Sequence, residues 1–223
     1  MSRCRDLPFD ISISEHLNIL DTNHMASSIN LHDKSGYLHL ILGPMFCGKT
    51  NELLNELHRF DMVGSKVMYL NSSLDNRADT PFSTHHPLVK TLGNIQGMKT
   101  NDLLSQIQPL GPYDVIGIDE AQFFPDLAEF VKTMVETHGK RVIVAGLSGN
   151  FRREPIGHLL DLLPWADRVD HLTAMCLVCA HRNGEMKPAP FSHRFSTTPD
   201  EIMVGANDKY MAVCRTCFNR LNG

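Results

Sequence analysis

The chain has 223 residues, of which 42% are hydrophobic and 21% are charged. That balance is typical of a packed globular protein and excludes a disordered chain. Its 21 Lys and Arg residues against 25 Asp and Glu residues give a formal net charge of −4. No basic run compensates locally, so we expect no nucleic-acid partner, because such binding depends on Lys and Arg contacts to phosphates.

No window reaches the roughly 18 uninterrupted apolar residues that a membrane helix needs. The first 30 residues carry Asp, Glu and His where a signal peptide has its apolar segment. We therefore expect a cytoplasmic protein with no membrane partner.

Residues 1–36 are rich in polar and turn-forming residues and have no sustained helical or strand period. This pattern predicts a flexible N-terminal extension. A targeting or regulatory role stays open for it.

From residue 37, short apolar runs alternate with amphipathic segments until the pattern fades near residue 170. The predicted strands are 37–42, 66–70, 114–119 and 141–147. The predicted helices are 50–60, 126–139 and 154–165. This alternation predicts an α/β domain over 37–170, with a parallel sheet covered by helices on both faces and ligands at the carboxyl ends of its strands. Residues 171–223 are expected to form a second, smaller domain.

The segment "GPMFCGKT" at 43–50 satisfies the phosphate-loop pattern G-x-x-x-x-G-K-[ST] between a predicted strand and a predicted helix. Its members are Gly43, Pro44, Met45, Phe46, Cys47, Gly48, Lys49 and Thr50. Backbone N–H groups and the helix N-terminus bind phosphates, Lys49 reaches the terminal phosphates, and the Thr50 hydroxyl ligates Mg²⁺. The alternative is a glycine-rich turn without a ligand. Cys47 is expected to be a small filler side chain of the loop. The alternative is a thiol whose pKa is lowered by Lys49 and the helix N-terminus.

An acidic pair, Asp119 and Glu120, ends the predicted strand 114–119. Beside a phosphate loop, a carboxylate at a strand end has the position of a Mg²⁺ ligand, which assigns Asp119. Glu120 faces the same edge, where it is able to accept a proton from an attacking hydroxyl. The alternative is a pair of solvated acids. These parts predict an ATP-using protein but leave the phosphoryl acceptor open.

Two Cys-x-x-Cys pairs near the C-terminus supply four thiols: Cys176, Cys179, Cys214 and Cys217. Four thiolates suit a tetrahedral structural Zn²⁺ site, whereas a redox-active pair has no need of a second copy. The 34 residues between the pairs form a loop that such a site ties down. This loop includes Phe191, Ser192, Arg194, Gly205, Asp208 and Tyr210. Aromatic rings next to backbone groups are suited to binding a nucleobase.

Four segments together resemble the type II, zinc-containing thymidine kinases: "GPMFCGKT", "IGIDEAQFFPD", "CLVC" and "GANDKYMAVCRTC". They occur in the order typical of that family, and the resemblance covers about residues 37–220. It implies a RecA-like P-loop sheet with a small zinc-bound lasso domain. It also implies a homotetramer.

The resemblance also implies roles for individual residues. Glu120 is the general base that takes the proton from the thymidine 5′-hydroxyl. Asp75 and Arg77 belong to the phosphate site, where Arg77 is catalytic, and Gln122 contacts the nucleotide. Phe151 stacks on thymine. The other thymidine-binding residues are Met45, Leu147, Tyr210 and, in the lasso, Glu201, Ile202, Met203, Val204 and Gly205.

The predicted function is thus ATP-dependent phosphorylation of thymidine to thymidine monophosphate, with ATP, Mg²⁺ and structural Zn²⁺. One alternative is a related kinase that prefers deoxyuridine or deoxycytidine. Another is a nucleotide-switched zinc-binding module, but its expected basic stripe is missing from residues 171–223, where the charges are scattered.

Overall fold

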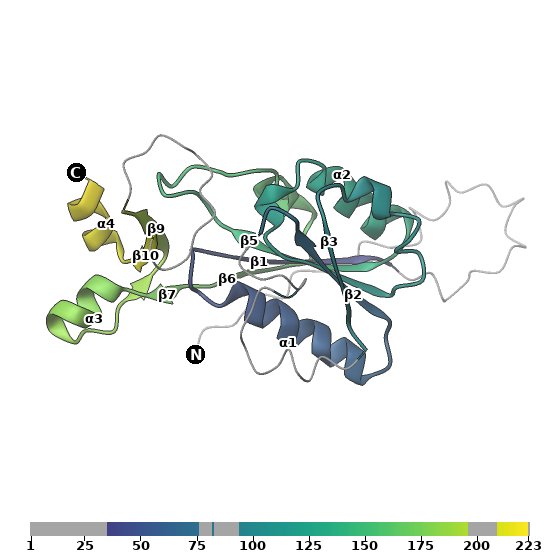
Figure 1. Cartoon of the computed structure of the whole chain (residues 1–223), viewed down its shortest axis with the longest axis horizontal. Coiled ribbons are helices and arrows are strands. Elements are labelled where there is room, and N and C mark those ends of the chain that lie inside the picture. The colour runs from purple at the N-terminus through teal and green to yellow at the C-terminus, as the bar shows by residue number, and fades with distance from the viewer. Residues whose placement is uncertain (1–34, 76–81, 83–93, 196–208, 223) are drawn as a thin grey trace, which may run out of the picture. The chain divides into compact units, whose positions relative to one another are not determined.

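The computed structural model describes residues 35–75, 82, 94–195 and 209–222 (Figure 1). The chain divides into the units Met1–Asp33 and Lys34–Gly223, and all described residues belong to the second. The expected extension over 1–36 therefore lies outside the described residues except for its last two positions. The boundary predicted near residue 170 stays a prediction.

Six strands of the described residues form one parallel sheet in the order β3-β2-β4-β5-β1-β6. They are β1 (Tyr37–Gly43), β2 (Val67–Ser72), β3 (Gln96–Thr100), β4 (Val115–Ile118), β5 (Arg141–Leu147) and β6 (Arg168–His171). The predicted α/β fold is confirmed. The sequence predicts β1, β2, β4 and β5, but it does not predict β3 and β6, whose residues are mostly polar.

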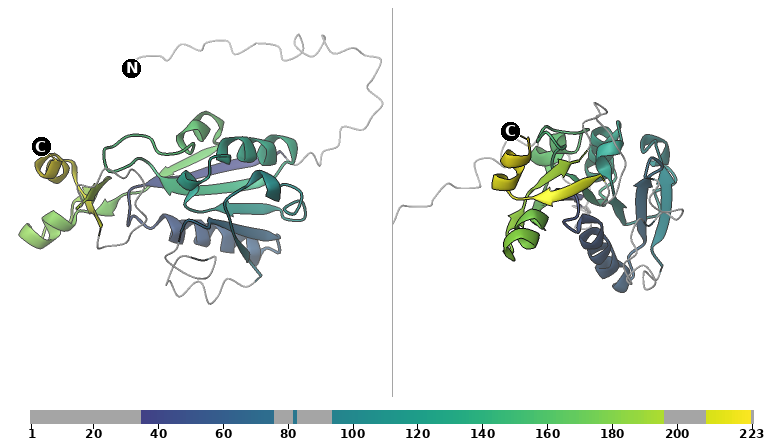
Figure 2. Two further views of the ribbon diagram at one scale, coloured as in Figure 1. Left: turned by 45° about the horizontal axis from the view of Figure 1, so that its top comes forward. Right: turned by 60° about the vertical axis from the view of Figure 1, so that its left-hand side comes forward.

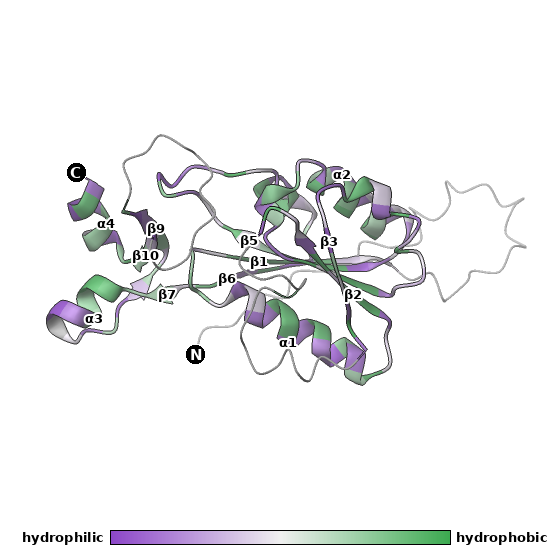
Figure 3. Ribbon diagram, in the orientation of Figure 1, coloured by the Kyte–Doolittle hydropathy of each residue, from purple (hydrophilic) through white to green (hydrophobic). Residues whose placement is uncertain are grey.

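Helices cover both faces of this sheet, as predicted (Figure 2). On one face lies α1 (Lys49–Met62), whose Leu53 and Leu57 pack with Ile41 of β1. On the other face lies α2 (Leu127–Lys132), whose Phe130 packs with Leu40. The adjacent β1 residues Leu40 and Ile41 pack on opposite faces of the sheet because side chains alternate along a strand. Full burial of one leucine is worth about 1.5–3 kcal/mol, so this packing anchors α1 and the loop before it. Hydrophobic and hydrophilic positions alternate along α1 (Figure 3).

Shorter helical turns complete the α/β part of the chain. They are η3 (Leu104–Gln106), η4 (Ala121–Phe123), η5 (Thr133–Thr137) and η6 (Leu160–Trp165). A π-helical turn, η5, extends α2, so the two together occupy most of the predicted helix 126–139. The helix predicted over 154–165 is wrong in its first half, and η6 is a 3-10 helix. Gly157 has a φ of 60° and lies against the Gln122 carbonyl, which turns the chain before η6 begins.

The segment 174–222 is here called the cysteine lobe, and its described residues form two small antiparallel strand pairs and two helices. Its elements are β7 (Ala174–Met175), α3 (Leu177–Asn183), β8 (Pro188–Ala189), β9 (Phe191–Arg194), β10 (Tyr210–Val213) and α4 (Arg215–Asn222). Four cysteines are part of its buried cluster. Among the described residues, no helix has the length and apolar character needed to cross a membrane.

Candidate active site

The predicted phosphate loop connects the end of β1 to the start of α1. Gly48 precedes the helix with a φ of 87°, and Phe46 also has a positive φ, 65°. A side chain at Gly43 would place its Cβ 2.8 Å from the Leu172 carbonyl oxygen and 2.5 Å from the Cys47 sulfur. The motif's glycines are therefore required by the backbone path and by the close approach of Leu172.

Lys49 is nearly buried at the first position of α1. Its Nζ donates a hydrogen bond to the Pro44 carbonyl at 2.7 Å and lies 3.9 Å from the Cys47 sulfur. The ammonium group thus lies against the loop, where it is placed to bind phosphate oxygens. Burial raises the Cys47 pKa above its ordinary value, and the nearby Lys49 charge does not reverse this. The alternative of a lowered thiol pKa is therefore not supported, and this direction agrees with Cys47 as a filler side chain.

The two predicted Mg²⁺ ligands meet at the carboxyl edge of the sheet. The Thr50 hydroxyl donates a hydrogen bond to Asp119 Oδ2 at 2.8 Å. Two adjacent ligands of an octahedral Mg²⁺ stand about 3 Å apart, so this spacing fits the ion. Burial, with the neighbouring Glu120 charge, raises the Asp119 pKa to about 6. A divalent cation would offset both effects.

Tyr69 is a residue of this site that the sequence does not reveal. It is fully buried in β2, and its hydroxyl donates to Asp119 Oδ2 at 2.8 Å. A tyrosine in an apolar strand is expected to pack in the core. The only signal of a role in the site is that a buried tyrosine hydroxyl needs a hydrogen-bond partner. Tyr69 therefore helps to fix the carboxylate that the Thr50 hydroxyl also contacts.

Glu120 follows Asp119 in a left-handed backbone conformation, with φ 49° and ψ 41°. Such a conformation is strained for a residue with a side chain and is held only by its surroundings. Here the Glu120 N–H donates to Asp119 Oδ1 at 2.9 Å, and Gln122 Nε2 donates to Glu120 Oε2 at 2.6 Å. The half-buried Glu120 carboxylate is thus oriented at the strand edge that carries Asp119.

Asp75, the other predicted phosphate-site residue of the described chain, is buried after β2. Its Oδ2 accepts a hydrogen bond from Asn71 Nδ2 at 3.1 Å, and its carbonyl oxygen accepts one from Lys99 Nζ at 2.8 Å. The predicted site residues Arg77 and 201–205 lie outside the described residues.

The described residues that the resemblance assigns to thymidine come from four places: Met45 from the phosphate loop, Leu147 from the end of β5, Phe151 from the segment after it and Tyr210 from β10. The Leu147 N–H donates to Gln122 Oε1 at 3.1 Å. The Arg194 guanidinium carbon of β9 stands 3.8 Å from the ring centroid of Phe151. Tyr210 of β10 pairs with Arg194 across the small sheet. The contact between Phe151 and Arg194 therefore joins the segment after β5 to β9.

The four predicted zinc ligands form one buried cluster, with their sulfur atoms all within 4.8 Å of one another. The Cys179 sulfur lies 3.8 Å from that of Cys214 and 3.7 Å from that of Cys217. Zn–S bonds of about 2.3 Å in a tetrahedron separate the sulfurs by about 3.8 Å, so the cluster fits Zn²⁺. Burial and the neighbouring thiols raise the Cys179 pKa to about 12. The thiols therefore need a cation in order to ionise together.

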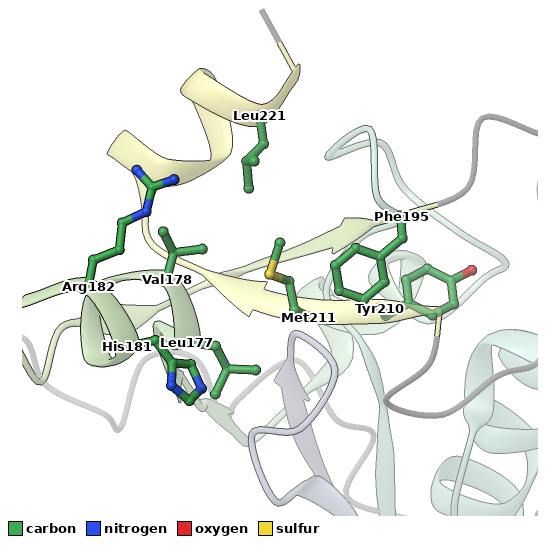
Figure 4. Close-up of a pocket in the computed structure, with 8 residues that line it drawn as sticks. All are labelled: Leu177, Val178, His181, Arg182, Phe195, Tyr210, Met211 and Leu221. Carbon is green, nitrogen blue, oxygen red and sulfur yellow. The ribbon is translucent and has the colours of Figure 1, made fainter. Parts of the chain in front are cut away.

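The cysteine lobe also has an open apolar pocket of about 400 Å³ on its surface (Figure 4). Side chains from α3, β10 and α4 line it, together with the residue that follows β9. They are Leu177, Val178, His181, Arg182, Phe195, Tyr210, Met211 and Leu221. Tyr210 is the predicted site residue among them, and the phosphate loop contributes none of the lining.

The chain is similar in sequence to thymidine kinases over most of its length. A family model described as "Thymidine kinase" matches residues 36–218. The thymidine kinase of Monkeypox virus is 38% identical over 183 residues, which cover 82% of this chain and 97% of the relative. That of Yaba monkey tumor virus (strain VR587) is 37% identical over 196 residues, covering 86% and 99%. Among solved structures, the flagellar accessory protein FlaH from Methanocaldococcus jannaschii aligns with a TM-score of 0.44 at 15% identity, over 69% of this chain and 76% of that one.

Proposed function

Because the chain belongs to the thymidine kinase family, we propose that it transfers the γ-phosphoryl group of ATP to the 5′-hydroxyl of thymidine. The hydrogen bond between Thr50 and Asp119 carries this proposal. It joins the start of the phosphate-loop helix to the acidic pair at the carboxyl edge of β4. The proposed binding site for ATP, the phosphoryl donor, and the proposed base Glu120 therefore lie in one site. The products are ADP and thymidine monophosphate.

In this proposal the N–H groups of 46–50 and the Lys49 ammonium hold the ATP phosphates. Thr50 and Asp119 would hold Mg²⁺, which would supply positive charge against the ATP phosphates. Glu120 accepts the proton of the thymidine 5′-hydroxyl as that oxygen forms its bond to the γ-phosphorus. The bond from the γ-phosphorus to the β,γ-bridging oxygen breaks, and ADP leaves with the electron pair.

Thymidine is proposed to lie between the end of β5 and the cysteine lobe. Phe151 stacks on the base, and Leu147, Met45 and Tyr210 line its pocket. Residues 201–205 close over it, and Asp75 with Arg77 act at the phosphates. The support for these roles is the family resemblance, together with the contacts that hold Phe151 and Met45 against β9.

The four clustered cysteines are proposed to hold a structural Zn²⁺ that joins α3 to α4 within the cysteine lobe. Their support is the sulfur spacing. A homotetramer and a cytoplasmic location are proposed on the family resemblance alone. Sedimentation of the purified chain tests the first, and imaging of the tagged protein tests the second.

The deciding experiment incubates the purified chain with labelled ATP, Mg²⁺ and separate nucleosides: thymidine, deoxyuridine, deoxycytidine and deoxyadenosine. We expect thymidine monophosphate as the main product. Glu120→Gln should lower kcat by about 10²- to 10⁴-fold, because proton transfer loses its base. Glu129→Gln, an exposed acid on α2, is the control and should match the wild type. Absence of product with every nucleoside would refute the proposal.

A further inference from the structure

One hydrogen bond joins the phosphate loop directly to the cysteine lobe. The Met45 N–H donates to the Ser192 hydroxyl oxygen at 2.9 Å, although 147 positions separate the two residues. Ser192 lies in β9 and is only 6% exposed. A lobe that is distant in sequence therefore supplies the partner for a backbone group of the loop.

β9 presents two different faces. Ser192 and Arg194 alternate with Phe191 and His193 along the strand. The first pair reaches Met45 and Phe151. On the other face, the Phe191 ring packs against Phe218 of α4, with centroids 5.4 Å apart. One face of β9 therefore packs within the cysteine lobe, and its other face contacts residues of the proposed active site.

The loop needs support at this point. Met45 precedes Phe46, whose φ of 65° is strained for a residue with a side chain. Such a conformation persists only where neighbouring groups hold it. The buried Ser192 hydroxyl restrains the peptide that joins Pro44 to Met45, one residue before Phe46. The Cys47 side chain packs against the buried cluster of the lobe. Met45 and Cys47, two positions apart in the loop, therefore both contact the cysteine lobe directly.

We propose that Ser192 is a positioning residue that sets the phosphate loop through Met45, so that affinity for ATP depends on the placement of β9. This inference deepens the proposed kinase function and rests on ATP being the ligand of the loop. Without the hydroxyl, the Met45 N–H loses its partner, and the loop samples conformations in which its N–H groups do not converge on the phosphates. The coupling is reciprocal, so bound ATP in turn steadies β9.

The test uses Ser192→Ala, which removes the hydroxyl, and Ser192→Thr, which keeps it. Ser105→Ala is the matched control, because within the described residues that exposed hydroxyl bonds only to its near neighbours Asp102 and Gln106. Titration calorimetry with Mg²⁺ and a non-hydrolysable ATP analogue, without nucleoside, gives the dissociation constant. Steady-state kinetics give kcat and the KM for ATP.

We expect Ser192→Ala to weaken analogue binding and raise the KM for ATP by about tenfold, as expected for a partly buried N–H that loses its partner. The kcat should change by less than about threefold. Ser192→Thr should restore affinity to within about twofold. An unchanged dissociation constant in a folded Ser192→Ala variant with full metal content would overturn the inference. A fall in kcat alone would also overturn it.

If Ser192→Ala does not fold, amide hydrogen exchange on the wild-type chain tests whether the Met45 N–H is held by a hydrogen bond. The Met45 amide should exchange slowly in the absence of nucleotide, and exchange as fast as an open loop would overturn the inference. Failure of the proposed kinase function is distinguishable from failure of the inference about Ser192. If the wild type binds the analogue but phosphorylates no nucleoside, the kinase proposal fails, whereas the affinities still decide the role of Ser192.

Discussion

Gln122 bridges the proposed base Glu120 to the end of β5. Its Nε2 donates to Glu120 Oε2 at 2.6 Å, and its Oε1 accepts from the Leu147 N–H at 3.1 Å. The side chain is nearly fully buried, so both ends of the amide are engaged within the protein. The resemblance implies a nucleotide contact for Gln122, and that role stays a prediction. The geometry favours orientation of Glu120.

The first prediction follows from this bridge. Gln122→Ala should lower kcat by about 10- to 100-fold, because a misplaced base loses alignment with the attacking hydroxyl. The dissociation constant for ATP should change by less than about threefold. Single-turnover kinetics and nucleotide titration measure the two quantities. Loss of ATP affinity with kcat retained would instead make Gln122 a nucleotide ligand.

The second prediction concerns Lys49. Its Nζ lies 2.7 Å from the Pro44 carbonyl, inside the loop that is proposed to hold the phosphates. Lys49→Ala should abolish measurable ATP binding and turnover, since no other lysine belongs to the loop motif. Lys49→Arg keeps the charge and should recover part of the ATP binding. It should recover little of the turnover, because the planar guanidinium group differs in shape from the compact ammonium group of lysine. Calorimetry that shows full ATP affinity for Lys49→Ala would contradict the role.

Local sequence patterns predicted the elements that carry the motifs. Apolar runs marked β1, β4 and β5, and helical periodicity marked α1, because these elements are buried by the sheet and its covering helices. The fold class and the location of the site at the carboxyl edge of the strands follow from these elements. β6 escaped prediction because an edge strand has one pairing partner and mostly exposed side chains.

The contacts that orient the site were less predictable. Tyr69 reaches Asp119 across 50 positions, and Ser192 reaches Met45 across 147. Such pairs depend on strand order and on the placement of the cysteine lobe, and no local spacing encodes either. The motif residues were therefore predictable, whereas the side chains that hold them in place had to be found in the structure.

The third prediction concerns the metal. Cys179→Ser should lose most of the bound zinc and lower the melting temperature, because the ligand lies within 3.8 Å of two others in the cluster. A strong chelator should have the same effect on the wild type. Metal analysis and thermal denaturation measure both outcomes. Cys47→Ser is the control, since Cys47 does not belong to the four-cysteine group. One full equivalent of zinc in Cys179→Ser would refute the assignment.

The fourth prediction concerns Cys47 reactivity. Burial raises its pKa above the ordinary value of 9.0, against the opposing charge of Lys49. Because the thiolate is the reactive form, Cys47 should react with iodoacetamide at pH 7 more slowly than free cysteine does. The rate should rise about tenfold per pH unit up to the thiol pKa. Mass spectrometry of the peptide that contains Cys47 follows the reaction, and labelling faster than that of free cysteine would contradict the raised pKa.

The fifth prediction concerns stability and pH at the sheet edge. His39 of β1 is buried, and its Nε2 lies 2.8 Å from Asp170 Oδ2 of β6, which also pairs with Arg168 at 2.7 Å. Burial alone would raise the Asp170 pKa, but hydrogen bonds from His39 and Arg168 outweigh it, and the net shift is downward from 3.8. A carboxyl with a lowered folded pKa stabilises the fold above its unfolded pKa, and this contribution disappears as the pH falls.

Asp170→Asn should therefore lower the free energy of unfolding at pH 7 by about 1–2 kcal/mol. The difference from the wild type should begin to shrink as the pH falls from about 5 toward the unfolded pKa of 3.8, and it should continue to shrink as the pH falls through the lower folded pKa. Urea denaturation at several pH values measures it. Asp161→Asn is the control, because its partner His158 and Asp161 itself are largely exposed and such pairs contribute little. A difference between Asp170→Asn and the wild type that stays constant down to pH 3 would show that packing, rather than charge, holds β6 to β1.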